Sequence, residues 1–415
     1  MNTGSGWQSR FVLVMAFAGW LFAGTQMSLT SLVANSATQD FLRDQPGGVS
    51  KTQTTTWFSR YNATFLFGAA AGGLLFGWLG DRFGRARALG HSVCCYTVFS
   101  FLAGFAQSPE QFVVCRFLGC LGIGGTWPNA IALVGETWPN VARPVLAGII
   151  GSAANVGLVL MGLLACYVQI TMEHWRWVMF LGGAPILVGL TILLFVPESP
   201  QWLATRGQYE SKSRAPVSEV LSPPLLSTTL IGIVLGAIPL FGGWGCTNWL
   251  VPWADQVGAT ADPALKAWTQ VYRSVGAAFS SFAGGWVSHK VGARLAYFLF
   301  SLSSLLIGQY IYQMLDPRAP SFNLWVFMLG TTSGFYFGWL PLYLPEMFPT
   351  RVRSTGAGVT FNAGRILTGL GVLGAGYLGS LSYFSGDYGK IGRVTSLVFM
   401  TGMIFIWLLP RRKTG

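Results

Sequence analysis

Charged side chains are scarce in this sequence. Asp, Glu, Lys and Arg make up 10% of the 415 residues, whereas an ordinary soluble domain carries about 25%. So few charges cannot cover a water-facing surface, and the composition therefore excludes an ordinary soluble protein. Apolar residues make up 52% of the chain and lie in long runs, which indicates a protein embedded in a membrane.

Residues that carry chemistry are scarce as well. The six cysteines form no CxxC pair, the sequence has only three histidines, and no GxxxxGK stretch followed by Ser or Thr occurs. These absences argue against a metal site and an internal ATPase. We therefore predict no enzyme activity, no metal and no cofactor.

Twelve apolar runs are long enough to cross a bilayer, whose core needs about 20 residues of helix. The first run has no cleavage site after it and is expected to remain as a helix. The chain is thus predicted to be an all-α membrane protein. The predicted spans are 11–34, 57–79, 88–107, 110–133, 144–168, 175–196, 226–250, 266–287, 294–314, 322–344, 354–376 and 393–410.

Lys and Arg are distributed unevenly between the two sides of these spans. Most lie on the side that holds both chain ends, for example Arg82 and Arg87, and fewer lie in the opposite loops, for example Arg43 and Lys266. The positive-inside rule then predicts cytoplasmic termini in a multi-pass protein of the plasma (inner) membrane. We attribute the net charge of +12 to loops that lie near anionic lipid. We therefore predict no nucleic-acid binding.

Two loop sequences occur twice, about 210 residues apart. The stretch GWLGDRFGRAR at 77–87 is repeated as GWVSHKVGAR at 285–294, and ETWPNVAR at 136–143 is repeated as EMFPTRVR at 346–353. Each pair falls in equivalent loops, so the two halves have the same orientation. We predict a first six-helix bundle at 1–196, a cytoplasmic linker at 197–225 and a second six-helix bundle at 226–415.

These motifs resemble those of a known family. The 77–87 loop is similar to the signature between helices 2 and 3 of the major facilitator superfamily. The stretches RFLGCLGIGG at 116–125, PESPQWL at 197–203 and PEMFPTRVR at 345–353 resemble motifs of its sugar-porter and organic-ion branches. The resemblance implies twelve transmembrane helices in two six-helix bundles with pseudo-twofold symmetry, which carry a solute by alternating access.

Opposite charges meet in the loops that carry these motifs. Ion pairs there could hold one side of the transporter shut, a gating role that the resemblance favours; the alternative is that the charges only set the topology. In the second half His289 replaces Asp81, so that copy of the gate should be weaker. The predicted gating residues are Asp81, Arg85, Glu136, Arg143, Glu198, Glu346 and Arg353.

Ionisable residues inside a span are costly and usually functional. All fourteen acidic residues fall in loops or at helix ends, whereas Arg60, Arg116, Arg273 and Arg365 fall inside spans. Arg60 and Arg116 are near external helix ends, where a long side chain can reach water. Arg365 lies twelve residues past Arg353, about 18 Å along a helix, and is therefore predicted near the bilayer centre.

A guanidinium without an acidic partner can grip the carboxylate of a substrate. We therefore predict a small organic anion, bound by Arg365 with help from Arg273. The alternative for Arg365 is bonding to backbone carbonyls or a wet cavity. Asn155 is its equivalent in the first half, and the resemblance adds a matching arginine in organic-anion transporters. The other predicted substrate-binding residues are Gln26, Trp127, Trp244, Asn248, Tyr336 and Trp339.

Other functions remain open at this stage. A neutral sugar porter is favoured by PESPQWL but not by Arg365, and a non-transporting receptor has no soluble domain with which to signal. Relatives that move acids with protons carry two acidic residues in helix 1, where this chain has FAGTQ at 22–26. This difference leaves three possible modes of transport. They are facilitated diffusion, exchange, and coupling to a proton or another ion through an acidic residue in a loop. The expected partners are the substrate and the lipid bilayer. We expect the protein to be a monomer.

Overall fold

The computed structural model describes residues 6–138, 143–205, 217–258, 260–349 and 351–410. Throughout these ranges the regular structure is helical, and no strand occurs in them. The first half contains α1 (Gly6–Phe41), α2 (Lys51–Phe83), α3 (Arg85–Ala103), α4 (Pro109–Thr137), α5 (Arg143–Tyr167), α6 (Arg176–Leu181) and α7 (Ile186–Phe195).

Two short helices follow, α8 (Pro200–Thr205) and α9 (Val217–Val220). The second half begins with α10 (Leu226–Phe241), a π-helical turn η1 (Gly242–Cys246), a 3₁₀ turn η2 (Thr247–Trp249) and α11 (Leu250–Gly258). It continues with α12 (Leu265–Val291), α13 (Ala293–Met314), α14 (Phe322–Glu346), α15 (Arg353–Ser380), α16 (Tyr388–Thr395), α17 (Val398–Phe405) and η3 (Ile406–Leu408).

Each predicted span corresponds to one helix or to one interrupted helix. The sixth span is divided into α6 and α7, because Gly182 and Gly183 weaken the helix and Pro185 begins a new one. The seventh is divided at the glycine-rich π turn η1. Eight helices of the described chain are long and apolar enough to cross a membrane. The other predicted spans correspond to α3, α12, α14 and α15, which are 19, 27, 25 and 28 residues long.

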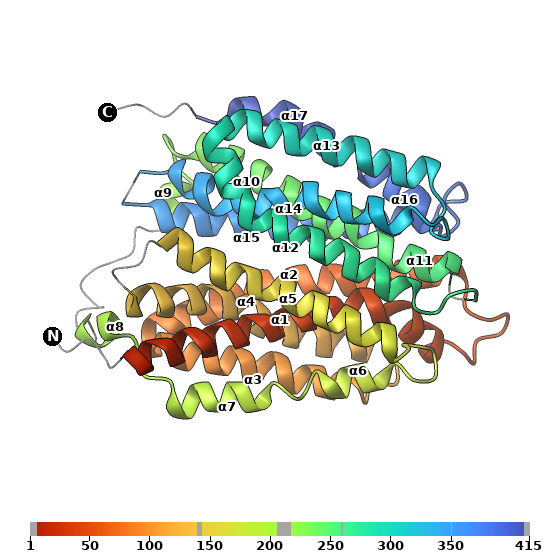
Figure 1. Ribbon diagram of the computed structural model, residues 1–415, viewed down its shortest axis with the longest axis horizontal. Helices are drawn as coiled ribbons and strands as arrows, with labels where there is room; N and C mark the ends of the chain where they lie inside the picture. Colours follow the sequence, from red (N-terminus) through yellow and green to blue (C-terminus); the bar gives the residue numbers. More distant parts are fainter. Residues whose placement is uncertain (1–5, 139–142, 206–216, 259, 350, 411–415) are drawn as a thin grey trace.

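Most of the helices run along the long axis of the molecule (Figure 1). The helices α1–α7 form one half and α10–α17 the other, and the halves meet where α2 packs on α15 and α5 packs on α12. The helix α1 begins at the same end of the molecule at which α17 ends. We call this the terminal end, and we call the end that carries α6, α11 and α16 the opposite end.

Glycine allows the closest helix contacts in the first half. A Cβ atom at Gly72 of α2 would lie 1.9 Å from the carbonyl oxygen of Leu121 on α4. A Cβ atom at Gly157 of α5 would lie 2.0 Å from the carbonyl oxygen of Leu21 on α1. Such backbone contact between helices is typical of membrane proteins. Lipid offers no hydrophobic driving force for helix association, so the helices depend on the close packing that small residues allow.

Candidate functional site

Arg365 lies at about the middle of α15, at the seam between the two halves. Its Nη1 atom donates to the carbonyl oxygen of Ala69 on α2 at 3.2 Å and lies 3.5 Å from Oδ1 of Asn362. The guanidinium also lies 4.7 Å from the centre of the Phe361 ring. Among the described residues no carboxylate pairs with it, and these contacts use only one of its three nitrogens. The half-buried guanidinium therefore keeps donors for a ligand.

The surroundings of Arg365 are small and polar. A Cβ atom at Gly73 of α2 would lie 3.4 Å from Asn362 Oδ1 and 3.7 Å from Arg365 Nη1, so glycine leaves room in front of both side chains. Asn155 on α5 donates to Ser281 on α12 at 3.4 Å, which is a second polar contact across the seam. Asn362 was not among the predicted site residues, although it precedes Arg365 by one helical turn on the same face.

Arg273 lies at a different depth from Arg365. Its Nη1 donates to Asn248 Oδ1 at 2.7 Å and its Nη2 donates to Gln270 Oε1 at 2.9 Å. Asn248 in turn donates to Asn62 of α2 at 3.0 Å. Arg273 reaches α2 only through Asn248, at Asn62, whereas Arg365 contacts Ala69 directly. These two positions on α2 are seven residues apart, about 10 Å along the helix axis. The predicted pair of arginines therefore does not form one site in this structure.

Several predicted binding residues lie in the cores of the two halves. Tyr336 and Trp339 are fully buried and bond across to α13, where Tyr336 pairs with Ser301 at 2.7 Å and Trp339 donates to the carbonyl of Ala293 at 2.9 Å. Gln26 is 1% exposed and donates to the carbonyl of Gly182 at 2.8 Å. These side chains pack helices together and present no surface to a ligand here, which differs from the prediction.

Trp127 and Trp244 are only partly buried, unlike the residues just described. Trp127 on α4 packs against Trp20 with ring centres 5.1 Å apart and lies beside Gly151 of α5. Trp244 in η1 packs against Phe65 of α2 at 4.3 Å. Both residues are thus partly exposed, and Trp244 lies at the seam through its contact with Phe65. The two indoles stay candidates for contact with a substrate.

Arg116 is buried in the first half without an acidic partner among the described residues. Its Nη2 donates to the backbone carbonyl of Gln26 at 3.1 Å and to the Thr30 hydroxyl at 3.0 Å. The prediction that this side chain reaches water at a helix end is wrong, since the residue is 2% exposed. The carbonyl and hydroxyl of α1 take the place of bulk water around the guanidinium.

The predicted gating charges of the first half gather at the terminal end. Asp81 pairs with Arg85, whose Nε lies 3.5 Å from Glu136 Oε1. Trp202 of α8 donates to the Asp81 carbonyl at 2.8 Å, and Glu198 accepts from the amide of Ala86 at 2.9 Å. These contacts join α8 to α2, join Glu198 just before α8 to α3, and join α3 to α4.

Gly84 makes this arrangement possible. Its φ of +117° allows the sharp turn from α2 to α3, and a Cβ atom there would lie 2.1 Å from Glu198 Oε2. Gly292 has a φ of +88° at the repeated position between α12 and α13. Of the remaining predicted gating residues, Glu346 and Arg353 are exposed at this end, and the side chain of Arg143 lies outside the described part of the structure.

The linker contacts both halves. While α8 contacts the first half through Trp202, α9 packs Val220 against Phe348 and Val352 of the second half. Glu219 of α9 also pairs with Arg351. The linker is thus anchored at each end, and residues 206–216 between the two anchors lie outside the described residues.

A buried polar network joins the halves at the opposite end. Lys266 of α12 pairs with Asp255 of α11 at 2.9 Å and donates to the carbonyl of Ile170 in the first half at 2.8 Å. Asp255 accepts from Asn35 of α1 at 3.0 Å, and Tyr388 donates to the same asparagine at 2.7 Å. From the sequence, Lys266 and Asp255 are expected in external loops. No motif indicates this network, because its residues lie far apart in the chain.

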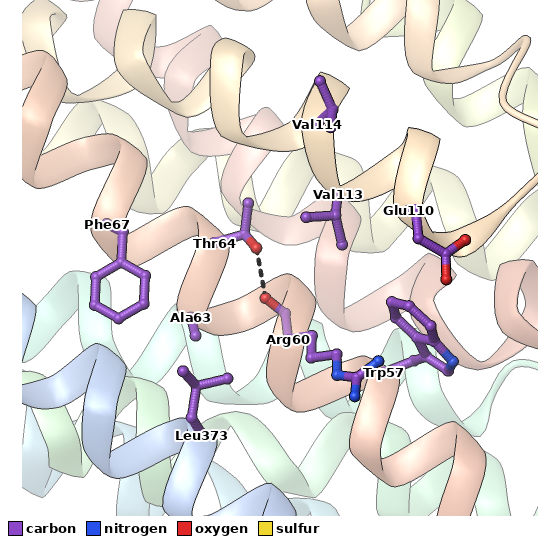
Figure 2. A pocket seen from close by; sticks show the side chains of 9 residues that line it. All are labelled: Trp57, Arg60, Ala63, Thr64, Phe67, Glu110, Val113, Val114 and Leu373. Atoms are coloured by element: carbon purple, nitrogen blue, oxygen red, sulfur yellow. Dashed lines mark hydrogen bonds between the residues drawn. The ribbon is translucent and has the colours of Figure 1, made fainter.

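A shallow pocket between α2, α4 and α15 is separate from these groups (Figure 2). Its charged residues are Arg60 and Glu110, and both are exposed. The guanidinium of Arg60 lies 4.4 Å from the Trp57 ring centre, as expected for an arginine that reaches the membrane surface. The rest of the pocket lining is mostly apolar, from Ala63 to Leu373, so this surface is suited to lipid and differs from the polar seam around Arg365.

The described chain has two halves of membrane-length helices and, at the seam between them, a guanidinium with no acidic partner in the described ranges. This is the architecture of a secondary transporter. The chain belongs to the Major Facilitator Superfamily, whose family model matches residues 11–372. This finding confirms the predicted family and fold, and the chain is a multi-pass membrane protein of a transporter family.

Similar proteins are known from bacteria. The cis,cis-muconate transport protein of Acinetobacter baylyi is 26% identical over 377 residues, which cover 89% of this chain and 88% of that protein. The sialic acid transporter NanX of Escherichia coli is 24% identical over 381 residues, which cover 92% and 88% of the two chains. The xylose transporter XylE of Escherichia coli, in a partially occluded inward open conformation, matches with a TM-score of 0.74 at 19% identity, over 97% of this chain and 98% of that one.

Proposed function

We propose that this protein carries a small organic anion across the membrane by alternating access, and that Arg365 binds the carboxylate of the substrate. The observation that carries the proposal is the guanidinium of Arg365 at the seam, with unused donors and no acidic partner among the described residues. A half-buried charge without an acidic partner is costly. A carboxylate can offset that cost by accepting two parallel hydrogen bonds from the guanidinium.

The surroundings of Arg365 support the same substrate class. Phe361 presents its ring to the guanidinium, and Asn362 offers an amide one turn away. The partly buried Trp127 and Trp244 supply flat apolar surface that suits an aromatic or sugar ring. Two relatives are described as transporters of muconate and of sialic acid, which are organic acids.

The orientation in the membrane and the mode of transport are also part of the proposal. We infer from the positive-inside rule that the terminal end faces the cytoplasm and the opposite end faces outward. The halves at 1–196 and 226–415 would then rock against each other, while the linker at 197–225 spans them. Gln26 in α1 carries no titratable group, which favours facilitated diffusion or exchange over proton coupling at that position.

A neutral sugar is the second candidate substrate. The PESPQWL sequence at 197–203 resembles that of sugar porters, and the fold is similar to a xylose transporter. A sugar would not need Arg365, so the two candidates predict different results when this residue is changed.

Ligand-induced stabilisation of the purified protein tests the proposal. Benzoate, muconate, sialic acid and xylose would each be added to wild type, Arg365→Ala and Arg365→Lys, because a ligand at 100 times its Kd stabilises the folded state by about 2.7 kcal/mol. We expect carboxylates to stabilise wild type, and Arg365→Ala to weaken their binding by roughly 10- to 100-fold, since a hydrogen bond to a charged group contributes about 1.5–3 kcal/mol.

Arg60→Ala provides the matched control, because Arg60 is an exposed arginine on the lipid-facing side of α2. This variant should keep the wild-type response to every compound. Retained carboxylate affinity in Arg365→Ala would contradict the proposal, and stabilisation by xylose alone would favour the sugar porter.

A further inference from the structure

Arg273 has a guanidinium whose partners are all neutral in the described structure. Its Nη1 donates to the side-chain oxygen of Asn248 at 2.7 Å, and its Nη2 donates to that of Gln270 at 2.9 Å. Both amides are buried, with exposed fractions of 1% and 0%. Amide oxygens are neutral, so they accept hydrogen bonds from the guanidinium but do not balance its charge. A carboxylate would bind the guanidinium more strongly than either amide does.

Contacts from the first half hold the two amides in place. Asn248 turns its oxygen toward Arg273 because its own Nδ2 donates to Asn62 of α2 at 3.0 Å. The orientation of Asn62 follows from its donation to the Trp244 carbonyl at 3.1 Å. The position of the Asn248 amide therefore depends on a residue from the other half of the molecule.

The second amide is fixed in a similar way. Gln270 donates from Nε2 to Ser274 at 2.8 Å, which leaves Oε1 to face Arg273. The same Oε1 accepts from Ser31 of α1 at 3.1 Å. The helices α1 and α2 together thus complete a hydrogen-bonded shell around the guanidinium of α12.

This shell can exist only while the opposite end is closed. If the halves separated there, the bond from Asn248 to Asn62 and the bond from Ser31 to Gln270 would break. The two amides could then turn away, and the guanidinium would face the opening. The site lies about 10 Å from the level of Arg365, measured along α2. One ligand carboxylate cannot bind both arginines at once across that distance.

We propose that Arg273 is a second anion-binding site, which receives a carboxylate only when the opposite end is open and is closed off by Asn248 and Gln270 when that end shuts. The inference rests on the proposed function, since it assumes a carboxylate substrate and alternating access. An anion that enters from the outside would bind Arg273 first and then pass to Arg365.

The test requires a form of the protein that is open at the opposite end. A Cβ atom at Gly376 of α15 would lie 2.3 Å from Ser59 of α2, so Gly376→Trp should wedge the halves apart there. Gly162→Trp is a second wedge, because a Cβ atom at Gly162 of α5 would lie 2.8 Å from Val271 of α12. Faster maleimide labelling of a cysteine placed at the buried Ser36 verifies the opening.

Equilibrium binding of radiolabelled benzoate then separates the two sites. Without a wedge, Arg365→Ala should bind benzoate roughly 10- to 100-fold more weakly than wild type. Arg365→Ala combined with either wedge should regain binding of one benzoate per chain. Adding Asn248→Asp, which gives Arg273 a permanent carboxylate partner of the same shape, should weaken that binding at least about tenfold. Arg273→Gln should do the same, and Arg273→Lys should restore part of the affinity.

Asn323→Asp is the control for the added charge, because Asn323 accepts from Thr269 at 3.2 Å instead of from Arg273. It should leave benzoate binding unchanged. The inference is overturned if both wedged Arg365→Ala variants bind no benzoate, or if their bound benzoate is insensitive to Asn248→Asp and Arg273→Gln. Failure of the proposed function gives a different result, namely undiminished benzoate binding by Arg365→Ala in the closed background.

Discussion

Lys266 and Asp255 form a buried ion pair at 2.9 Å, and both partners also bond to the first half of the molecule. The ammonium donates to the carbonyl of Ile170 at 2.8 Å, and the carboxylate accepts from Asn35 at 3.0 Å. Their side chains are 5% and 13% exposed, so water screens the pair little. The pair therefore forms part of the closure between the halves at the opposite end.

Removal of one partner of this pair should destabilise the protein. Lys266→Met keeps most of the side-chain length but leaves Asp255 as a buried carboxylate, which costs about 3–5 kcal/mol in comparable cases. We expect a loss of that size in the free energy of unfolding, measured by denaturant titration in detergent micelles. The double variant Lys266→Met/Asp255→Leu should recover much of the loss, because it removes both charges.

The exposed pair of Asp316 and Arg318 is the control for this experiment. Hydrogen bonding by Arg318 lowers the pKa of the Asp316 carboxyl, but both side chains are open to solvent. A pair in such a position contributes about 0–1 kcal/mol. Arg318→Met should therefore be close to neutral, and an equal loss in the two variants would refute the role assigned to Lys266.

Helix packing in the first half predicts opposite effects for two glycines of α2. Gly72→Ala places a methyl group where the Leu121 carbonyl of α4 now lies, and such overpacking costs about 1–3 kcal/mol. Gly77→Ala meets nothing within 4 Å and should be neutral or up to about 1 kcal/mol stabilising, since alanine favours helix. Thermal unfolding of the two variants in one detergent distinguishes them, and equal effects would show that packing is not the cause.

The charge cluster of Asp81, Arg85 and Glu136 predicts a kinetic effect. Asp81→Asn or Glu136→Gln removes a carboxylate from the nearly buried Arg85. We expect slower uptake into proteoliposomes and greater labelling of the terminal end by a soluble reagent, with unchanged affinity for carboxylates at Arg365. The cluster holds the terminal end together, whereas the binding residues lie near the middle of the helices.

The exposed Asp44 supplies the control for that prediction. Its side chain is 96% exposed and lies 3.8 Å from Arg43, so Asp44→Asn should leave uptake unchanged. Wild-type uptake in Asp81→Asn or Glu136→Gln, together with unchanged labelling, would contradict the gating role.

The sequence alone determined the helices and their approximate ends. The predicted span at 294–314 is the helix Ala293–Met314, and the span at 322–344 is Phe322–Glu346. This agreement has a physical basis, since a chain in hydrocarbon must satisfy its backbone hydrogen bonds within each segment and must match the bilayer thickness. The position of Arg365 near the middle of α15 followed from the same rule, as a count of residues from the helix end.

The tertiary structure decided which side chains meet. The helix α14 is apolar on most of its surface, so no periodicity indicated that Tyr336 and Trp339 face α13 and not a cavity. Arg273 was predicted beside Arg365, but its partners Asn248 and Gln270 hold it at another depth. Lys266 is expected in an external loop from the sequence, but in the structure it donates to the carbonyl of Ile170. A hydrogen bond between residues 96 positions apart depends on how the helices pack, so it leaves no pattern in either segment.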